Sequence, residues 1–129
     1  MFRAFILLAI LLGSFQAMNA AYTIDVSKST QTLKAKEHGL FIVSVKIEPE
    51  VQLNQEAPIE LVLEKNLKLQ FTKTTLNKTG NAFQFQIPFQ AITIGKQAIK
   101  GELRFFLCRA NTCTAIKESL SHNVEVNAY

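Results

Sequence analysis

Residues 39–47 read GLFIVSVKI, and this stretch decides the fold class. Apolar side chains recur at every second position from Phe41 to Ile47, with Ser44 and Lys46 between them. Such alternation is typical of a β-strand with one buried face, because successive side chains of a strand point to opposite sides. Pro49 follows and is expected to end the strand.

The same alternation recurs along the chain in short blocks separated by Pro, Gly, Asn and Lys. Tyr22 to Val26 is expected to form an opening strand, Pro88 to end an edge strand, and Thr114 to Leu120 to be a strand rather than a helix. The inward sets are expected to be Ile59, Leu61 and Leu63; Leu67, Leu69 and Phe71; Phe83, Phe85 and Ile87; Leu103, Phe105 and Leu107; and Val124 with Val126. The pattern predicts an all-β protein, an immunoglobulin-like antiparallel β-sandwich of seven to eight strands.

The first 20 residues differ from the rest. Arg3 precedes an apolar run from Ala4 to Leu12, and Ala20 supplies a small residue for cleavage. This is the anatomy of a secretory signal peptide, and the run is shorter than the roughly 20 apolar residues that a membrane span needs. We therefore expect residues 1–20 to be cleaved and residues 21–129 to form one exported domain without a stable membrane anchor.

Charge and composition exclude several classes of function. The formal net charge is +4, but the lysines are scattered rather than clustered into the basic patch that nucleic-acid binding requires. His38 and His122 lie far apart without neighbours at metal-ligand spacing, so we expect ordinary surface residues, no metal and no cofactor. No acid–base constellation or Gly-rich phosphate loop supports hydrolase or transferase chemistry.

The chemically distinctive feature is a close cysteine pair. Residues 101–117 read GELRFFLCRANTCTAIK, so an alternating strand runs into Cys108 and four residues separate it from Cys113. We expect a β-hairpin with one cysteine on each strand, where facing Cα atoms lie about 4.5–5.5 Å apart. A disulfide spans that distance, and an oxidising compartment would form one.

Two interpretations of the pair remain open. A ring of six residues stabilises by only about 2 kcal/mol in the chain-entropy model, against nearly 5 kcal/mol for a domain-wide bridge. The bridge is thus either a weak structural staple or a redox-active pair. Phe106 shares its strand face with Cys108 and is a candidate for shielding the pair or contacting a partner. Arg109 is a second candidate, because a guanidinium turned towards the sulfur favours a thiolate.

The chain resembles the amino-terminal domain of the bacterial thiol:disulfide interchange protein DsbD. Three stretches carry the resemblance: Phe41 to Ile47 with Pro49; Val51 to Pro58 with Leu61 and Leu63; and Gly101 to Cys113. The resemblance as a whole covers nearly all of the chain after the signal peptide. The best-known member has five residues between its cysteines, where this sequence has four.

The resemblance implies a periplasmic domain, with Cys108 and Cys113 as its catalytic, disulfide-forming pair. Such a domain takes electrons from a thioredoxin-like periplasmic or membrane reductase domain and passes them to oxidised periplasmic proteins, as a component of a thiol:disulfide oxidoreductase. A cap over the pair is expected at the turn from Leu76 to Phe83 or at Phe106. The alternative function is a non-catalytic exported binding module, in which the disulfide only rigidifies a recognition hairpin.

Overall fold

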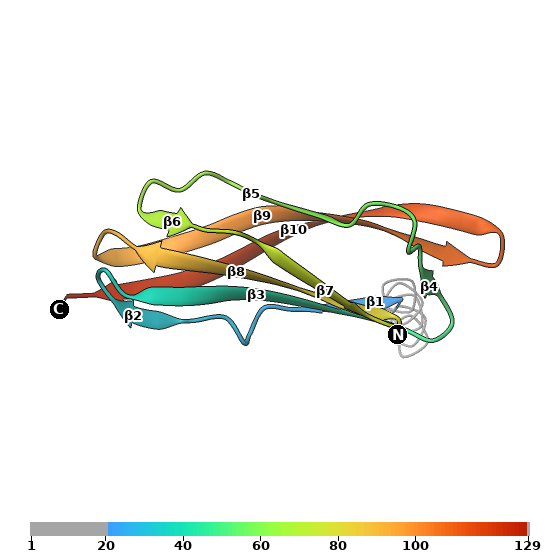
Figure 1. The fold of residues 1–129 in the computed structure, drawn as a ribbon, viewed down its shortest axis with the longest axis horizontal. Helices are drawn as coiled ribbons and strands as arrows, with labels where there is room; N and C mark the ends of the chain where they lie inside the picture. Colours follow the sequence, from blue (N-terminus) through green and yellow to red (C-terminus); the bar gives the residue numbers. More distant parts are fainter. Residues whose placement is uncertain (1–20, 129) are drawn as a thin grey trace, which may run out of the picture.

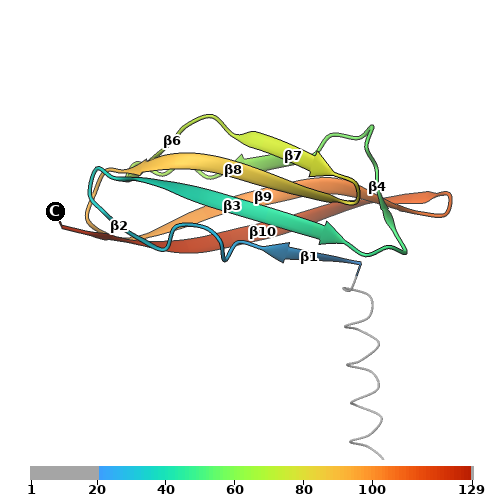
Figure 2. The same ribbon diagram turned by 60° about the horizontal axis from the view of Figure 1, so that its bottom comes forward.

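The protein consists of two five-stranded β-sheets packed face to face, as described by a computed structural model (Figures 1 and 2). The structure describes residues 21–128. Its strands are β1 (Tyr22–Asp25), β2 (Thr32–Lys34), β3 (His38–Ile47), β4 (Gln52–Leu53), β5 (Glu60–Leu63), β6 (Leu69–Phe71), β7 (Thr75–Thr79), β8 (Ala82–Ala91), β9 (Gly95–Arg109) and β10 (Thr112–Asn127). The predicted all-β sandwich is confirmed. Its additional strands include β2 and β4, which are too short to produce a periodic pattern.

The two sheets share one plan, in which a long strand pairs with two short strands along the same edge. The first sheet has the order β1-β3-β8-β6, and β7 also pairs with β8. The second has the order β2-β10-β9-β4, and β5 also pairs with β9. All of these pairs are antiparallel except β2 with β10, which is parallel. The β9–β10 hairpin is the longest unit and extends past the neighbouring strands at the end where it turns (Figure 1).

The core lies between the sheets and contains most of the side chains that alternation predicts to face inward. Ile59, Leu61, Leu63 and Phe71 are only half-buried and pack against this core. On β3 the buried face runs from Phe41 to Ile47, and on β9 Leu103 and Phe105 are wholly buried. The largest fully buried side chains are Phe41, Phe89, Phe105, Leu69, Ile87, Ile99, Leu103, Val43, Val45, Val124 and Val126. Burial of apolar surface stabilises the folded state by about 25 cal/mol per Å², so this contiguous cluster is the main source of stability.

The expectation for Leu67 is wrong, because this side chain is 83% exposed. Asn66 precedes it, and the Asn66 Oδ1 accepts a hydrogen bond from the backbone N–H of Lys68 at 2.8 Å. That local turn interrupts the alternation, so β6 begins only at Leu69.

The expectation for Pro88 is also wrong, because β8 continues through it to Ala91 and lies inside its sheet. The Pro88 carbonyl accepts the N–H of Thr72 at 2.9 Å, which shows that the Pro88 backbone faces the short strands β6 and β7. Pairing with β7 ends at Gln86 and pairing with β6 starts at Phe89. Proline is tolerated here because its missing N–H falls at the gap between the two short strands.

His122 is buried, contrary to the expectation of a surface residue, whereas His38 is exposed at the start of β3. The His122 ring stacks on Phe41 with ring centroids 5.9 Å apart. Its Nε2 lies 2.9 Å from the Thr30 carbonyl oxygen, so the imidazole has a polar partner inside the core.

The signal peptide predicted for residues 1–20 lies outside the described residues. Within residues 21–128, no helix has the length and hydropathy of a membrane span.

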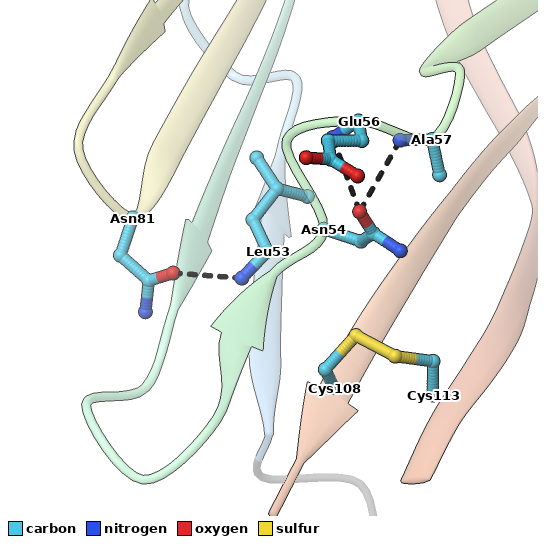
Figure 3. Close-up of a disulfide and its surroundings, with 7 residues drawn as sticks. All are labelled: Leu53, Asn54, Glu56, Ala57, Asn81, Cys108 and Cys113. Atoms are coloured by element: carbon cyan, nitrogen blue, oxygen red, sulfur yellow. Dashed lines mark hydrogen bonds between the residues drawn. A yellow bond between two sulfur atoms is a disulfide. The ribbon is translucent and has the colours of Figure 1, made fainter. Parts of the chain in front are cut away.

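Asn81, in the turn between β7 and β8, ties three elements together. Its Nδ2 donates to the carbonyls of Ile47, Glu48 and Val51 at 3.3, 3.2 and 2.9 Å. Its Oδ1 accepts the N–H of Leu53 at 3.0 Å (Figure 3). The side chain therefore fixes the chain from the end of β3 to β4.

We predict that Asn81→Ala lowers the free energy of unfolding by about 2 kcal/mol, because half-buried backbone groups lose their partners. Urea denaturation measures the loss. Asn77→Ala, at an exposed position of β7, is the control and is expected to change stability by less than about 0.5 kcal/mol. Equal effects of the two substitutions would contradict the assigned role of Asn81.

Candidate functional site

The cysteine pair lies at the tip of the β9–β10 hairpin. The two strands pair without interruption from Val126 opposite Gly95 to Thr112 opposite Arg109. Cys113 stands directly across from Cys108, one pair before the turn. The predicted hairpin with a cysteine on each strand is confirmed.

The two sulfurs form a disulfide, as predicted, with S–S 2.02 Å and Cα–Cα 4.0 Å. That Cα separation is slightly below the expected range. No free cysteine occurs within residues 21–128. Thiol–disulfide chemistry of the described residues would therefore involve these two cysteines.

The disulfide is open to solvent on one side. Cys113 is exposed and Cys108 is half-buried. Every residue from Arg109 to Ala115 is exposed, so both faces of the hairpin tip are in solvent. The tip also lies at the opposite end of the sandwich from the C-terminus (Figures 1 and 2). A partner protein can thus approach Cys113 without opening the core.

The two candidate neighbours of the pair lie on opposite faces of the hairpin. Phe106 is half-buried on the outer face, which it shares with Cys108 and with Ala115 across the ladder. Arg109 is exposed and lies on the inner face with Leu107, as strand alternation requires. Of the two, Phe106 is the one placed beside the disulfide.

Residues 53–57 run past the disulfide and were not assigned to the site from the sequence (Figure 3). The Asn54 N–H donates to the carbonyl of Phe106 at 3.0 Å, and the Asn54 Oδ1 accepts the N–H groups of Glu56 and Ala57 at 3.1 and 3.2 Å. An asparagine that binds the backbone two and three residues ahead marks a tight turn. That turn was detectable in the sequence, but its position beside the cysteines was not. The turn from Leu76 to Phe83, one of the two regions expected to supply a cap, reaches β4, because the Asn81 Oδ1 accepts the N–H of Leu53; its role as a cap stays a prediction.

An apolar groove of about 650 Å³ runs along the inner face of the hairpin tip. Its lining includes Ala21, Tyr22, Val51, Leu107, Thr114 and Ile116. The groove and the exposed sulfur of Cys113 therefore lie on the two faces of the same short length of β10.

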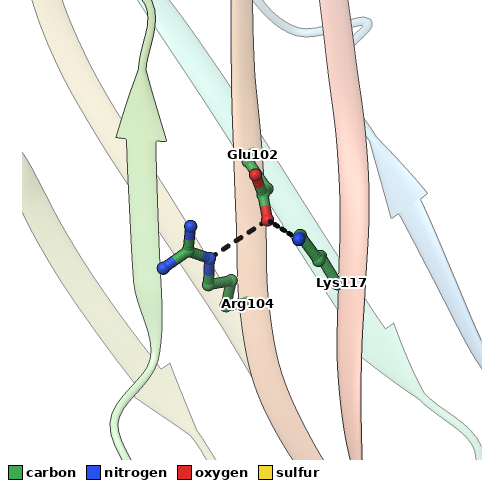
Figure 4. A network of polar contacts seen from close by, with 3 residues as sticks. All are labelled: Glu102, Arg104 and Lys117. Atoms are coloured by element: carbon green, nitrogen blue, oxygen red, sulfur yellow. Dashed lines mark hydrogen bonds and ion pairs between the residues drawn. The ribbon is translucent and has the colours of Figure 1, made fainter.

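A group of charges on the outer face lies further down the hairpin (Figure 4). The Glu102 carboxylate is 3.1 Å from the Arg104 Nε and 3.3 Å from the Lys117 Nζ. The hydrogen bond from Arg104 and then that from Lys117 lower the pKa of Glu102. Arg104 and Lys117 are exposed and Glu102 is partly exposed, so the ion pairs contribute little to stability. No cluster of three His, Cys, Asp or Glu side chains suited to a metal ion occurs in the described part of the chain.

Tyr22 lies at the groove and donates a hydrogen bond from its hydroxyl to the Glu118 Oε1. Burial first, and then the hydrogen bond and the charge of Glu118, raise the pKa of Tyr22 to about 12. A folded-state pKa above the unfolded value of about 10 means that ionisation opposes folding. The stabilisation from Tyr22 is complete below pH ~10 and is lost as the pH rises towards 12.

We therefore predict that raising the pH from 9 to 11 destabilises the wild type more than Tyr22→Phe. Urea unfolding at the two pH values measures this difference. Tyrosine absorbance gives an independent check, because the chain has two tyrosines and the variant retains only Tyr129. A Tyr22 that ionises near pH 10 in the folded domain would contradict the prediction.

The turn at the tip contains a strained residue. Ala110 has φ 55°, in the left-handed region that glycine favours. A residue with a Cβ is destabilised by roughly 1–2 kcal/mol in this conformation. We predict that Ala110→Gly raises the free energy of unfolding by about 0.5–1 kcal/mol, since greater freedom of the unfolded chain offsets part of the relief. Ala115→Gly, in the extended strand, is the control and should lower it by about 0.5–1 kcal/mol. A loss of stability in both variants, read from thermal denaturation, would be inconsistent with strain at Ala110.

Comparison with known proteins assigns neither a family nor an activity to the chain. No protein-family model and no curated protein matches the chain in sequence. Among solved structures it is similar to the N-terminal periplasmic domain of ScsB from Proteus mirabilis, at 12% identity and a TM-score of 0.44. The match covers 80% of this chain and 51% of that one, so the chain spans about half the length of that structure. Similarity at this level assigns neither a family nor an activity, and the DsbD resemblance read from the sequence stays a prediction.

Proposed function

We propose that this domain exchanges thiols and disulfides with other proteins through Cys108 and Cys113. The observation that carries the proposal is the position of the disulfide, with an exposed Cys113 at the end of a hairpin that extends past the core. Exposed disulfides have higher reduction potentials than buried structural ones and are the labile or catalytic kind.

The chemistry needs a dithiol protein as reductant. A thiolate of that protein attacks one sulfur of the Cys108–Cys113 bond, which breaks and leaves a mixed disulfide and one cysteine thiolate on the domain. The second thiol of the reductant then attacks the mixed disulfide. The domain becomes a dithiol, having gained two electrons and two protons, and the reductant becomes a disulfide. The reverse sequence reduces an oxidised protein and restores the bond.

The disulfide is expected to make only a modest contribution to the stability of the fold. A sequence separation of 5 closes a small ring, worth about 2 kcal/mol in the chain-entropy model. The two buried sheet faces supply a continuous apolar core that does not include either cysteine. A bond that adds little to folding and lies in solvent is better suited to exchange.

The setting of the function follows from the sequence and forms part of the proposal. The signal peptide predicted at residues 1–20 would export the domain, and the periplasm is the compartment in which we place it. Its reductant there is a thioredoxin-like domain, periplasmic or membrane-bound, and its substrates are oxidised periplasmic proteins. No nucleic acid and no cofactor take part.

The reduction potential of the pair tests the proposal. Purified domain is equilibrated with glutathione or dithiothreitol buffers, and the reduced fraction is counted by thiol alkylation and mass spectrometry. We expect a value above about −300 mV. A lower value would identify a structural bridge and leave the non-catalytic binding module as the better account.

A further inference from the structure

The edge of β10 beside the disulfide is unpaired within the described residues. β10 pairs with β9 along its length, but β2 covers its other edge only from Glu125 to Asn127. From Thr112 to Asn123 that edge has no strand beside it. An unpaired edge carries backbone donors and acceptors that an extended peptide can use.

The register shows which residues present those groups. The Glu125 N–H donates to Gln31 on the β2 side, so the backbone of Glu125 points away from β9. The ladder has no bulge between Thr112 and Val126, so every second residue shares this direction back to Cys113. The β9 side agrees, because the Phe106 carbonyl, opposite Ala115, is occupied by the Asn54 N–H. Cys113, Ala115 and Lys117 therefore offer their N–H and C=O groups to the free edge.

We propose that a cysteine-containing extended segment of the exchange partner binds this edge as an added antiparallel strand next to Cys113. This inference rests on the proposed function. A residue placed directly across from Cys113 in a hydrogen-bonded pair has its Cα about 5.5 Å away and its side chain on the same outer face. That geometry is suited to a disulfide. The added strand would hold the partner cysteine where the mixed disulfide forms.

The groove determines which segment fits. Neighbours of the partner cysteine point to the opposite face of an added strand, which is the inner face of the hairpin. There they lie across from Thr112 and Thr114, and one of them is diagonal to Ile116; all three residues line the apolar groove. The edge therefore selects a segment in which apolar residues flank the cysteine, with the backbone supplying affinity and the flanking side chains supplying specificity.

Two peptides test this selection. Each has ten residues and one cysteine joined by a disulfide to thionitrobenzoate, with valines flanking the cysteine in one and serines in the other. A thiolate of the reduced domain attacks the peptide sulfur and releases coloured thionitrobenzoate, and the second cysteine then frees the peptide thiol and re-forms the Cys108–Cys113 bond. We expect the valine peptide to react about tenfold faster than the serine peptide, after each rate is divided by the rate of that peptide with glutathione.

A proline variant tests the edge itself. Ala115→Pro removes a donor from the free edge and leaves the hydrogen bonds to β9 intact, whereas Ser121→Pro does the same at a site far from Cys113. We expect Ala115→Pro to slow the valine peptide about tenfold and Ser121→Pro to leave it unchanged. The exchange of both variants with glutathione disulfide should match the wild type, which shows that the thiols and the fold are intact.

A second measurement does not depend on the rate of thiol exchange. In Cys108→Ser, the valine peptide is trapped on Cys113, and exchange of the Ala115 and Lys117 amides with deuterium is followed by NMR. We expect at least tenfold slower exchange than in the glutathione adduct of the same variant, which carries the same bond without a strand.

The outcomes separate the two proposals. If neither peptide reacts faster with the domain than with glutathione, that result counts against the exchange function itself. Fast exchange that Ala115→Pro leaves unchanged, with unprotected amides in the trapped adduct, would overturn the added strand alone. A dimer through β10 that the valine peptide does not dissociate would also overturn it, because a second copy would then occupy the edge.

Discussion

Truncating Phe105 to alanine is expected to lower the free energy of unfolding by about 3–5 kcal/mol, the usual loss for a buried phenylalanine. The Phe105 side chain is wholly buried. Its ring meets Tyr22 and Phe83 edge to face, with centroids 5.4 and 5.3 Å apart. Phe105 thus joins the hairpin to both β1 and β8, and its removal leaves a cavity that three strands line.

The adjacent residue provides the control. Phe106 has the same side chain on the same strand but lies half-buried on the outer face. Phe106→Ala is therefore expected to cost less than about 2 kcal/mol, since less apolar surface is lost from a buried environment. Urea denaturation of both variants measures the difference. Equal losses would show that the outer face is as important to folding as the core.

The second large effect concerns function. Replacing both Cys108 and Cys113 with serine is expected to abolish thiol exchange, because no sulfur remains to form a mixed disulfide. The same double variant should lose at most about 2 kcal/mol of stability, since the ring it opens is small. Exchange is followed with a reduced thioredoxin-like protein and stability by thermal denaturation. A domain that fails to fold without the bond would contradict the proposed division between core and site.

Single substitutions refine this prediction. Cys108→Ser retains the exposed Cys113, and Cys113→Ser retains the half-buried Cys108. We expect the first variant to trap more mixed disulfide with periplasmic proteins than the second, because its thiol is the more accessible one. Trapping is read by non-reducing electrophoresis. Adducts on neither variant would weaken the exchange function.

Alternation in the sequence was enough to predict the faces of the long strands. Phe41 and Val43 on β3 and Leu103 and Phe105 on β9 are buried as expected. A two-residue period depends only on residues that are close in sequence, so it can be recognised without knowing the fold. The hairpin and its disulfide were predictable for the same reason. Cys108 and Cys113 are close in sequence, and a short polar segment between two apolar runs specifies the turn.

Features that depend on distant residues were not predictable. Pro88 is tolerated inside a sheet because the two short strands beside it leave a gap. The sequence near Pro88 gives no sign of that gap. The burial of His122 needs the Thr30 carbonyl, far away in the chain. Asn54 reaches Phe106 only through the packing of β4 on β9. In each case the deciding partner comes from another part of the fold.

The unbroken ladder below the cysteines has a consequence for electron transfer. Leu107 and Phe105, the first buried inner-face residues of β9 below the tip, are already in the core, so β9 is anchored immediately beneath Cys108. Opening the Sγ–Sγ bond is therefore expected to release only the turn and the cysteine pair itself. If the pair exchanges as proposed, we expect the domain to gain and release two electrons at the tip with little rearrangement elsewhere. The proposed function therefore predicts that mutations in the core change the thermal stability of the domain more than they change its rate of thiol exchange.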